Sequence, residues 1–124
     1  MSKILVVDDD LEILNLTKRL LERNGYQVYI AKDAKECLNT VKTVRPDLII
    51  LDIIMPERDG ITLLNELKGK DSTWDIPVIM LSAKGATDSL LEAQQEGALD
   101  YFIKPCNWDQ LLQYINKYLT YYGK

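Results

Sequence analysis

Short apolar runs alternate along this chain with longer amphipathic stretches, and this alternation restricts the possible folds more than any other feature. Ile4–Val7, Leu48–Leu51 and Val78–Leu81 are brief runs of largely branched apolar residues, typical of strands buried on both faces. Val28–Ile30 and Tyr101–Ile103 predict two further short strands. The chain therefore offers five short strands, each too short to be an independent helix.

Between these strands, apolar residues recur at helical spacing. The pattern predicts helices over residues 11–24, 34–44, 61–68, 87–96 and 108–121. Gly25, Pro46, Gly69 and Gly97 are the expected stops, and Asn107 is the expected cap of the last helix. No repeat, low-complexity tract or interdomain linker interrupts the series, so we expect residues 1–124 to form a single domain.

Strands that alternate with helices predict an α/β fold with a parallel sheet, because each parallel connection must cross over one face. Five units predict a doubly wound, five-stranded sheet in the flavodoxin-like order 2-1-3-4-5, with helices on both faces. In that order the switch point lies between strands 1 and 3. Ligands of such sheets bind beyond the carboxyl ends of the strands.

Polar residues follow the strands at that edge. Asp8 and Asp9 follow the first strand, Asp52 the third, Ser82 the fourth and Lys104 the fifth. Clustered carboxylates repel one another, and a divalent cation relieves the repulsion. Oxygen donors without nearby His or paired Cys favour Mg²⁺ or Mn²⁺ over zinc.

The same edge suits phosphoryl transfer. A carboxylate can attack phosphorus to form an aspartyl phosphate, and the transfer depends on positioning and on neutralising the phosphoryl oxygens. Asp52 is the best nucleophile candidate because it lies between the other groups. The cation, Lys104 and the Ser82 hydroxyl would each meet one phosphoryl oxygen.

Each residue also has a structural explanation. Asp9 with Glu12 fits a helix capping box, and Asp52 taken alone fits a turn. Ser82 can begin a loop, and Lys104 can be a solvated lysine. The occurrence of complementary groups at four strand ends together favours a site over these separate explanations.

Composition excludes several other functions. The net charge is −4 and no run of Lys and Arg occurs, which argues against direct nucleic-acid binding. The chain has no His, which removes His-based catalysis and most zinc sites. Cys37 and Cys106 lack metal-ligand spacing and suggest reduced thiols, with a disulfide as the alternative. No signal peptide or membrane span is predicted, so we expect a cytoplasmic protein.

Four motifs resemble the receiver domains of two-component response regulators, the family that includes CheY, over essentially the whole chain. They are ILVVDDD, LDIIMPERDG, MLSA and GALDYFIKP. The resemblance implies that Asp52 is the phosphoacceptor. It also implies that Asp8, Asp9 and Asp52 hold Mg²⁺, with the backbone carbonyl of Ile54 as a further ligand.

The resemblance assigns the remaining roles as well. Ser82 matches the switch hydroxyl, Lys104 the phosphate-pairing lysine, and Tyr101 the aromatic residue whose ring moves inward when the hydroxyl engages phosphate. The Lys104–Pro105 bond is expected to be cis. The implied phosphodonor is a sensor histidine kinase or a histidine phosphotransfer protein.

The output surface implied by the resemblance comprises the helix after strand 4, strand 5 and the last helix, which would contact a downstream protein. The protein is expected to be a monomer or a weak homodimer, and a signalling switch rather than a conventional enzyme. Trp108, Tyr114, Tyr118, Tyr121 and Tyr122 either pack the last helix or enlarge a partner face; packing is the favoured interpretation. Ile54 gives no polar side chain to guide water, which predicts a long-lived phosphoryl group.

Three competing functions fit the sequence less well. A phosphatase with an aspartyl-phosphate intermediate needs a cap segment or a substrate pocket, and neither can be identified. A flavin or nucleotide carrier needs a phosphate loop after the first strand, where three Asp residues would repel phosphate. A degenerate receiver, acting only in binding, is disfavoured because the residue set is complete.

Overall fold

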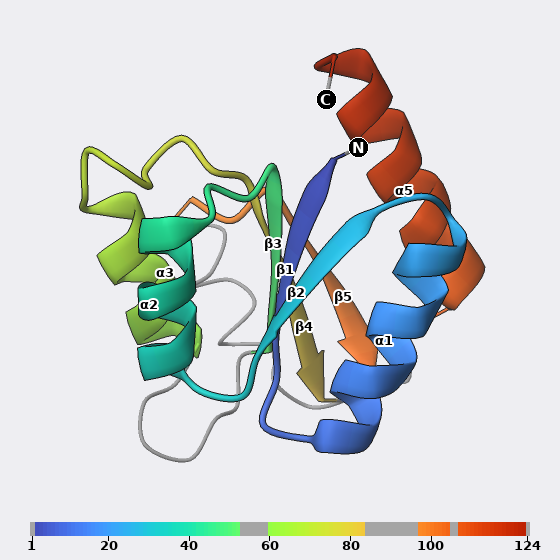
Figure 1. Ribbon diagram of the computed structural model, residues 1–124, viewed down its shortest axis with the longest axis horizontal. Helices are drawn as coiled ribbons and strands as arrows, with labels where there is room; N and C mark the ends of the chain where they lie inside the picture. Colours follow the sequence, from blue (N-terminus) through green and yellow to red (C-terminus); the bar gives the residue numbers. More distant parts are fainter. Residues whose placement is uncertain (1, 53–59, 84–96, 105–106, 124) are drawn as a thin grey trace.

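Five parallel strands form one sheet in the order β2-β1-β3-β4-β5. The computed structural model describes residues 2–52, 60–83, 97–104 and 107–123, with the backbone alone for residues 82, 83, 103 and 104 (Figure 1). The strands are β1 (Lys3–Val7), β2 (Gln27–Ala31), β3 (Leu48–Asp52), β4 (Val78–Ala83) and β5 (Asp100–Lys104). The predicted α/β class and the flavodoxin-like strand order are confirmed.

Helices cover both faces of the sheet, α2 and α3 on one and α1 and α5 on the other (Figure 1). Their bounds are α1 (Leu11–Arg23), α2 (Ala34–Thr43), α3 (Gly60–Lys68) and α5 (Trp108–Tyr121). The helix expected over residues 87–96 lies outside the described residues. None of the described helices is both long and apolar enough to cross a membrane.

Helix ends follow local signals in the sequence. Gly25 adopts a φ of +88° just after α1, a left-handed conformation that glycine adopts without steric cost, so the predicted stop is confirmed. Asn107 caps α5, as predicted, by accepting a hydrogen bond from the backbone N–H of Gln110. Asp33 caps α2 in the same way, through the N–H of Glu36 at 2.8 Å.

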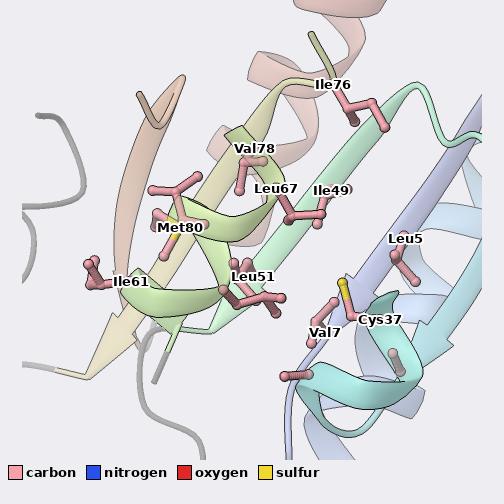
Figure 2. Close-up of a cluster of buried hydrophobic side chains, with 14 residues drawn as sticks. Leu5, Val7, Cys37, Ile49, Leu51, Ile61, Leu67, Ile76, Val78 and Met80 are labelled. Carbon is pink, nitrogen blue, oxygen red and sulfur yellow. The ribbon is translucent and has the colours of Figure 1, made fainter. Parts of the chain in front are cut away.

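Two apolar clusters hold the layers together. Side chains of β1, β3 and β4 alternate between them, because successive residues of a strand point to opposite faces. Leu5, Ile49 and Leu51 pack with α2 and α3 in the cluster of Figure 2. Ile4 and Ile50 belong to the opposite cluster, with α1 and α5. Burial on both faces explains why these strands are continuous apolar runs.

The aromatic residues of the last helix divide into two groups. Trp108, Tyr114 and Tyr118 pack against the cluster of the α1 and α5 face, so the packing interpretation is confirmed for them. Tyr121 is 81% exposed, and its ring meets that of Tyr122 with centroids 5.0 Å apart. The terminal pair therefore adds little to the core.

Candidate functional site

The sheet topology brings the acidic residues of two strands together. β1 and β3 are neighbours, and Val7 is in register with Leu51. Asp8 directly follows Val7, and Asp52 is the last residue of β3. Parallel strands end at a common edge, so Asp8 and Asp52 emerge side by side from the middle of the sheet.

Three carboxylates meet at this edge. Asp8, Asp9 and Asp52 each place a carboxylate oxygen within 4.8 Å of those of the other two. Asp8 is 1% exposed and Asp52 is 5% exposed, whereas Asp9 is exposed. Two acids therefore form the inner part of the cluster, and the third borders solvent.

Asp10 has a different task from its two neighbours. Its Oδ1 accepts hydrogen bonds from the N–H groups of Glu12 at 2.9 Å and Ile13 at 3.3 Å, which makes Asp10 the N-cap of α1. The capping box of Asp9 and Glu12, given above as the structural alternative, does not form, although the Asp8–Asp10 run does supply the cap. Asp9 lies one residue before the cap, and its carboxylate joins the acidic cluster instead.

The cap also orients the inner acid. The backbone N–H of Asp10 donates to Oδ1 of Asp8 at 3.0 Å. Asp8 itself extends the ladder, since its N–H donates to the carbonyl of Ala31 at 3.1 Å. The turn from β1 into α1 thus fixes both the backbone and one carboxylate oxygen of Asp8.

The donor set fits a hard divalent cation. At an effective dielectric constant of about 20, two carboxylates about 5 Å apart repel by about 3 kcal/mol, so a cation between them is strongly favoured. Mg²⁺ binds oxygen at about 2.1 Å, which places opposite ligands about 4.2 Å apart and leaves positions for water. The spacing of Asp8, Asp9 and Asp52 is compatible with a shared ion after small side-chain rotations.

The backbones of the other two predicted site residues reach the same edge. Asp52 is in register with Leu81, the residue before Ser82, and Ala83 is in register with Lys104. The positions of the Ser82 and Lys104 side chains stay a prediction. Ile54 and the Lys104–Pro105 bond lie outside the described residues, as does Cys106.

Tyr101 lies beside the core on β5. It is half-buried and packs against the cluster of the α2 and α3 face. Its N–H donates to the carboxylate of Asp100 at 2.8 Å. No pattern in the sequence predicts a second contact of Asp100, whose carboxylate accepts a hydrogen bond from the Tyr114 hydroxyl. Burial and this carboxylate raise the pKa of Tyr114 to about 12. Asp100 thereby links the start of β5 to α5.

Comparison with known proteins identifies relatives over nearly the whole chain. Residues 4–116 match the family model described as the response regulator receiver domain. The chain is 38% identical to sporulation initiation phosphotransferase F of Bacillus subtilis over 118 residues, covering 95% of this chain and 94% of that protein. It is 39% identical to the chemotaxis protein CheY of the same organism over 119 residues, covering 95% and 98%.

A solved structure agrees with this match. The response regulator receiver domain protein from Clostridium thermocellum superposes with a TM-score of 0.90 at 34% identity, covering 99% of this chain and 98% of that one. Other curated relatives are longer: the chain spans 43% of the transcriptional regulatory protein PrrA of Mycobacterium tuberculosis. Relatives of this chain therefore occur both as single domains and within larger regulators.

Proposed function

Because the chain belongs to the response regulator receiver domain family of two-component systems, we propose that it accepts a phosphoryl group on Asp52 in a Mg²⁺-dependent reaction and changes its surface in response. Receivers act as phosphoacceptor switches that take phosphate from histidine kinases and regulate effectors. The observation that carries the proposal is the juxtaposition of Asp8, Asp9 and Asp52 at the switch point of the sheet.

The reacting atoms follow from this arrangement. A carboxylate oxygen of Asp52 attacks phosphorus of a phosphohistidine, the new O–P bond forms, and the P–N bond breaks with its electron pair leaving on the imidazole nitrogen. Asp8, Asp9 and Asp52 would hold Mg²⁺, with the carbonyl of Ile54 as a further ligand. The bound ion would neutralise charge on a phosphoryl oxygen.

Strand spacing explains the residue types proposed for the other oxygens. Adjacent strands lie about 4.8 Å apart, so β5 lies about 10 Å from β3. Lys104 on β5 would need its long side chain to reach a phosphoryl group on Asp52. Ser82, on the intervening strand β4, would need only a short hydroxyl.

The same hydroxyl supplies the proposed switch. Ser82 would engage phosphate in one of two states, and the Tyr101 ring would report which state is populated. The responding surface would run from β4 to α5 and contact a downstream protein. Phosphorylation can shift the population only toward a state in which the phosphoryl group makes contacts that the other state lacks.

The test is modification of the whole chain by acetyl phosphate or beryllofluoride, with and without Mg²⁺, followed by intact mass and NMR. We expect the mass of one phosphoryl group to be added with Mg²⁺ and acetyl phosphate. Asp52→Asn should abolish the gain, while Asp71→Asn, which removes an exposed acid elsewhere, should not. A phosphoryl group that persists in Asp52→Asn would place the acceptor on another residue.

The lifetime of the phosphoryl group tests one further residue. Ile54 has no polar side chain to orient an attacking water, so we propose slow autodephosphorylation. Ile54→Asn should shorten the half-life of the phosphoprotein, measured as loss of phosphoryl mass after removal of the donor. An unchanged half-life would contradict the role given to Ile54.

A further inference from the structure

A hollow lies at the opposite end of the sheet from Asp52. It is an open cavity of about 340 Å³ between the end of α2 and the loop from α3 to β4, both of which lead into the amino ends of strands. Half-buried Leu38 and Val41 form its apolar inner part. The exposed residues Lys42, Arg45 and Lys70 surround the opening.

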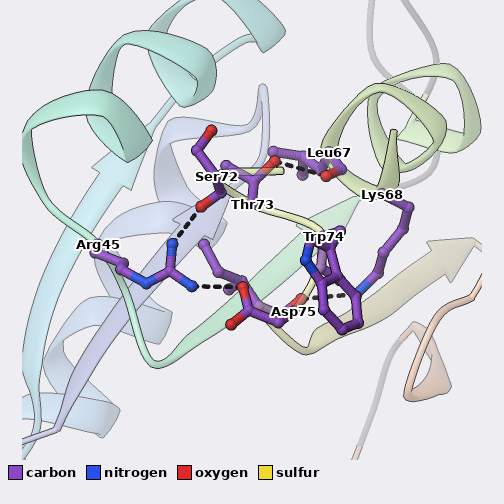
Figure 3. A network of polar contacts seen from close by, with 8 residues as sticks. Arg45, Leu67, Lys68, Ser72, Thr73, Trp74 and Asp75 are labelled. Atoms are coloured by element: carbon purple, nitrogen blue, oxygen red, sulfur yellow. Dashed lines mark hydrogen bonds and ion pairs between the residues drawn. The ribbon is translucent and has the colours of Figure 1, made fainter. Parts of the chain in front are cut away.

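The wall of this cavity is held in place by polar contacts. The guanidinium of Arg45 donates to the carbonyl of Ser72 and to the carboxylate of Asp75 (Figure 3). The hydroxyl of Thr73, itself a buried residue, donates to the carbonyl of Leu67 at 2.6 Å. The loop is thus fixed to α3 and to the segment that follows α2, which lowers the entropy cost of placing a ligand against it.

Two of the surrounding cations are left available. Arg45 is paired with Asp75, but the ammonium groups of Lys42 and Lys70 make no hydrogen bond or ion pair with the residues that the structure describes. They lie on different elements, Lys42 in the last turn of α2 and Lys70 after α3. This is a cationic opening on a chain whose net charge is −4.

We propose that this cavity binds an acidic segment of a partner protein, with one apolar side chain inside and flanking carboxylates on Lys42 and Lys70. The volume is near the lower limit for ligand sites, which are about 300–1,000 Å³, so it suits a side chain better than a large cofactor. The charge around the opening selects acidic over basic segments. The surface is separate from the Asp52 edge and does not depend on phosphorylation.

The experiment is an NMR titration of the ¹⁵N-labelled full chain with the peptide acetyl-Glu-Leu-Glu-amide. We expect saturable amide shifts within residues 38–45 and 70–75. Acetyl-Gln-Leu-Gln-amide and acetyl-Glu-Gly-Glu-amide, which remove the charges or the apolar side chain, should each bind at least tenfold more weakly. Both comparisons use the unmodified protein, so they do not depend on how a variant folds.

Variants then locate the contacts. Lys42→Gln with Lys70→Gln should weaken binding at least tenfold. Lys35→Gln is the matched control, because Lys35 is an exposed lysine of the same helix that does not line the cavity. It should bind like the unmodified chain. The Asp52→Asn variant should also bind the peptide with unchanged affinity. Failure of this proposal can therefore be told apart from failure of the phosphorylation proposal.

Three results would overturn the proposal. The first is the absence of saturable shifts at the cavity, which would leave Lys42 and Lys70 with only the role of offsetting the negative ends of their helices. The second is unchanged affinity in the double variant. The third is binding of free 3-phenylpropionate as tight as that of the peptide, since a simple organic anion would then suffice.

Discussion

The two ends of the sheet use charge in opposite ways. At the carboxyl end, Asp8, Asp9 and Asp52 bring three like charges within 4.8 Å of one another. At the amino end, Arg45 meets Asp75 and a carbonyl, and the Lys68 ammonium donates to the carbonyls of Trp74 and Ile76 at 3.1 and 2.8 Å. One end therefore concentrates charge that a cation can relieve, and the other uses charge to hold a loop.

The difference between the ends follows from what each must do. At the amino end, pairing of polar groups holds the loop from α3 to β4 in place and so fixes the wall of the cationic cavity. A site that binds a cation and reacts needs carboxylate oxygens directed at a common point. Changes made at one end should therefore leave the behaviour of the other end unchanged.

The first prediction tests whether a dry core separates the two ends. Cys37 packs beside Val7 and Leu5 (Figure 2), and burial, with a smaller contribution from Glu66, raises the pKa of its thiol from 9.0 to about 12. Only the unfolded chain ionises this thiol between those values. The free energy of unfolding should therefore fall by about 1.4 kcal/mol per pH unit above about pH 9 from this group alone.

The measurement is urea unfolding at several pH values for the unmodified chain and for Cys37→Ala. The variant loses packing at every pH, but its stability should decline less steeply above about pH 9, because tyrosines and lysines titrate alike in both proteins. Parallel declines would mean that solvent reaches the thiol and that the core does not isolate the two ends.

The second prediction concerns the carboxyl end. Mg²⁺ at 100 times its dissociation constant should raise the free energy of unfolding by about 2.7 kcal/mol, because the ion binds the folded cluster. Asp9→Asn should lose most of this gain, and Asp71→Asn should keep it. Urea unfolding with and without Mg²⁺ measures both; equal gains in the two variants would remove Asp9 from the ion's ligands.

The third prediction concerns the amino end. Thr73→Val keeps the side-chain shape but leaves the Leu67 carbonyl without the hydroxyl that donates to it, which should cost about 1–3 kcal/mol of unfolding free energy. Ser72→Ala is the control, since Arg45 contacts only the backbone carbonyl of Ser72, and it should change stability by less than about 0.5 kcal/mol. Mg²⁺ should stabilise both variants as it does the unmodified chain. A reduced Mg²⁺ gain would show that the ends are coupled.

The smallest expected effect belongs to the cap that adjoins the acidic cluster. Asp10→Ala removes the acceptor for the N–H groups of Glu12 and Ile13 and should cost about 1 kcal/mol, whereas Asp10→Asn should retain most of the cap. Thermal unfolding of the two variants without Mg²⁺ gives the comparison. Equal losses would mean that the charge of Asp10 matters more than its hydrogen bonds.

Some features were harder to predict than the fold. Three consecutive Asp residues have similar capping ability, so the sequence does not single out Asp10, whose backbone at φ −86° and ψ 109° takes the cap. The predicted third and fifth strands were too short, because Asp52 and Asp100 are polar and do not belong to the apolar runs. Pairing with neighbouring strands nevertheless extends β3 and β5 over these two residues. The contact between Arg45 and Asp75 joins residues that are 30 positions apart in the sequence, and no local sequence pattern predicts it.

The layered α/β architecture and the edge at which its acids emerge follow from the order of residues alone. Apolar runs of strand length must be covered on both faces, and parallel strands share their carboxyl end, so Asp8 and Asp52 had to meet there. The folded chain, by contrast, sets which acids come within 4.8 Å, which one caps α1, and whether a cationic cavity forms at the far end. These depend on the packing of segments distant in sequence, because a distance between side chains is set by the elements that carry them.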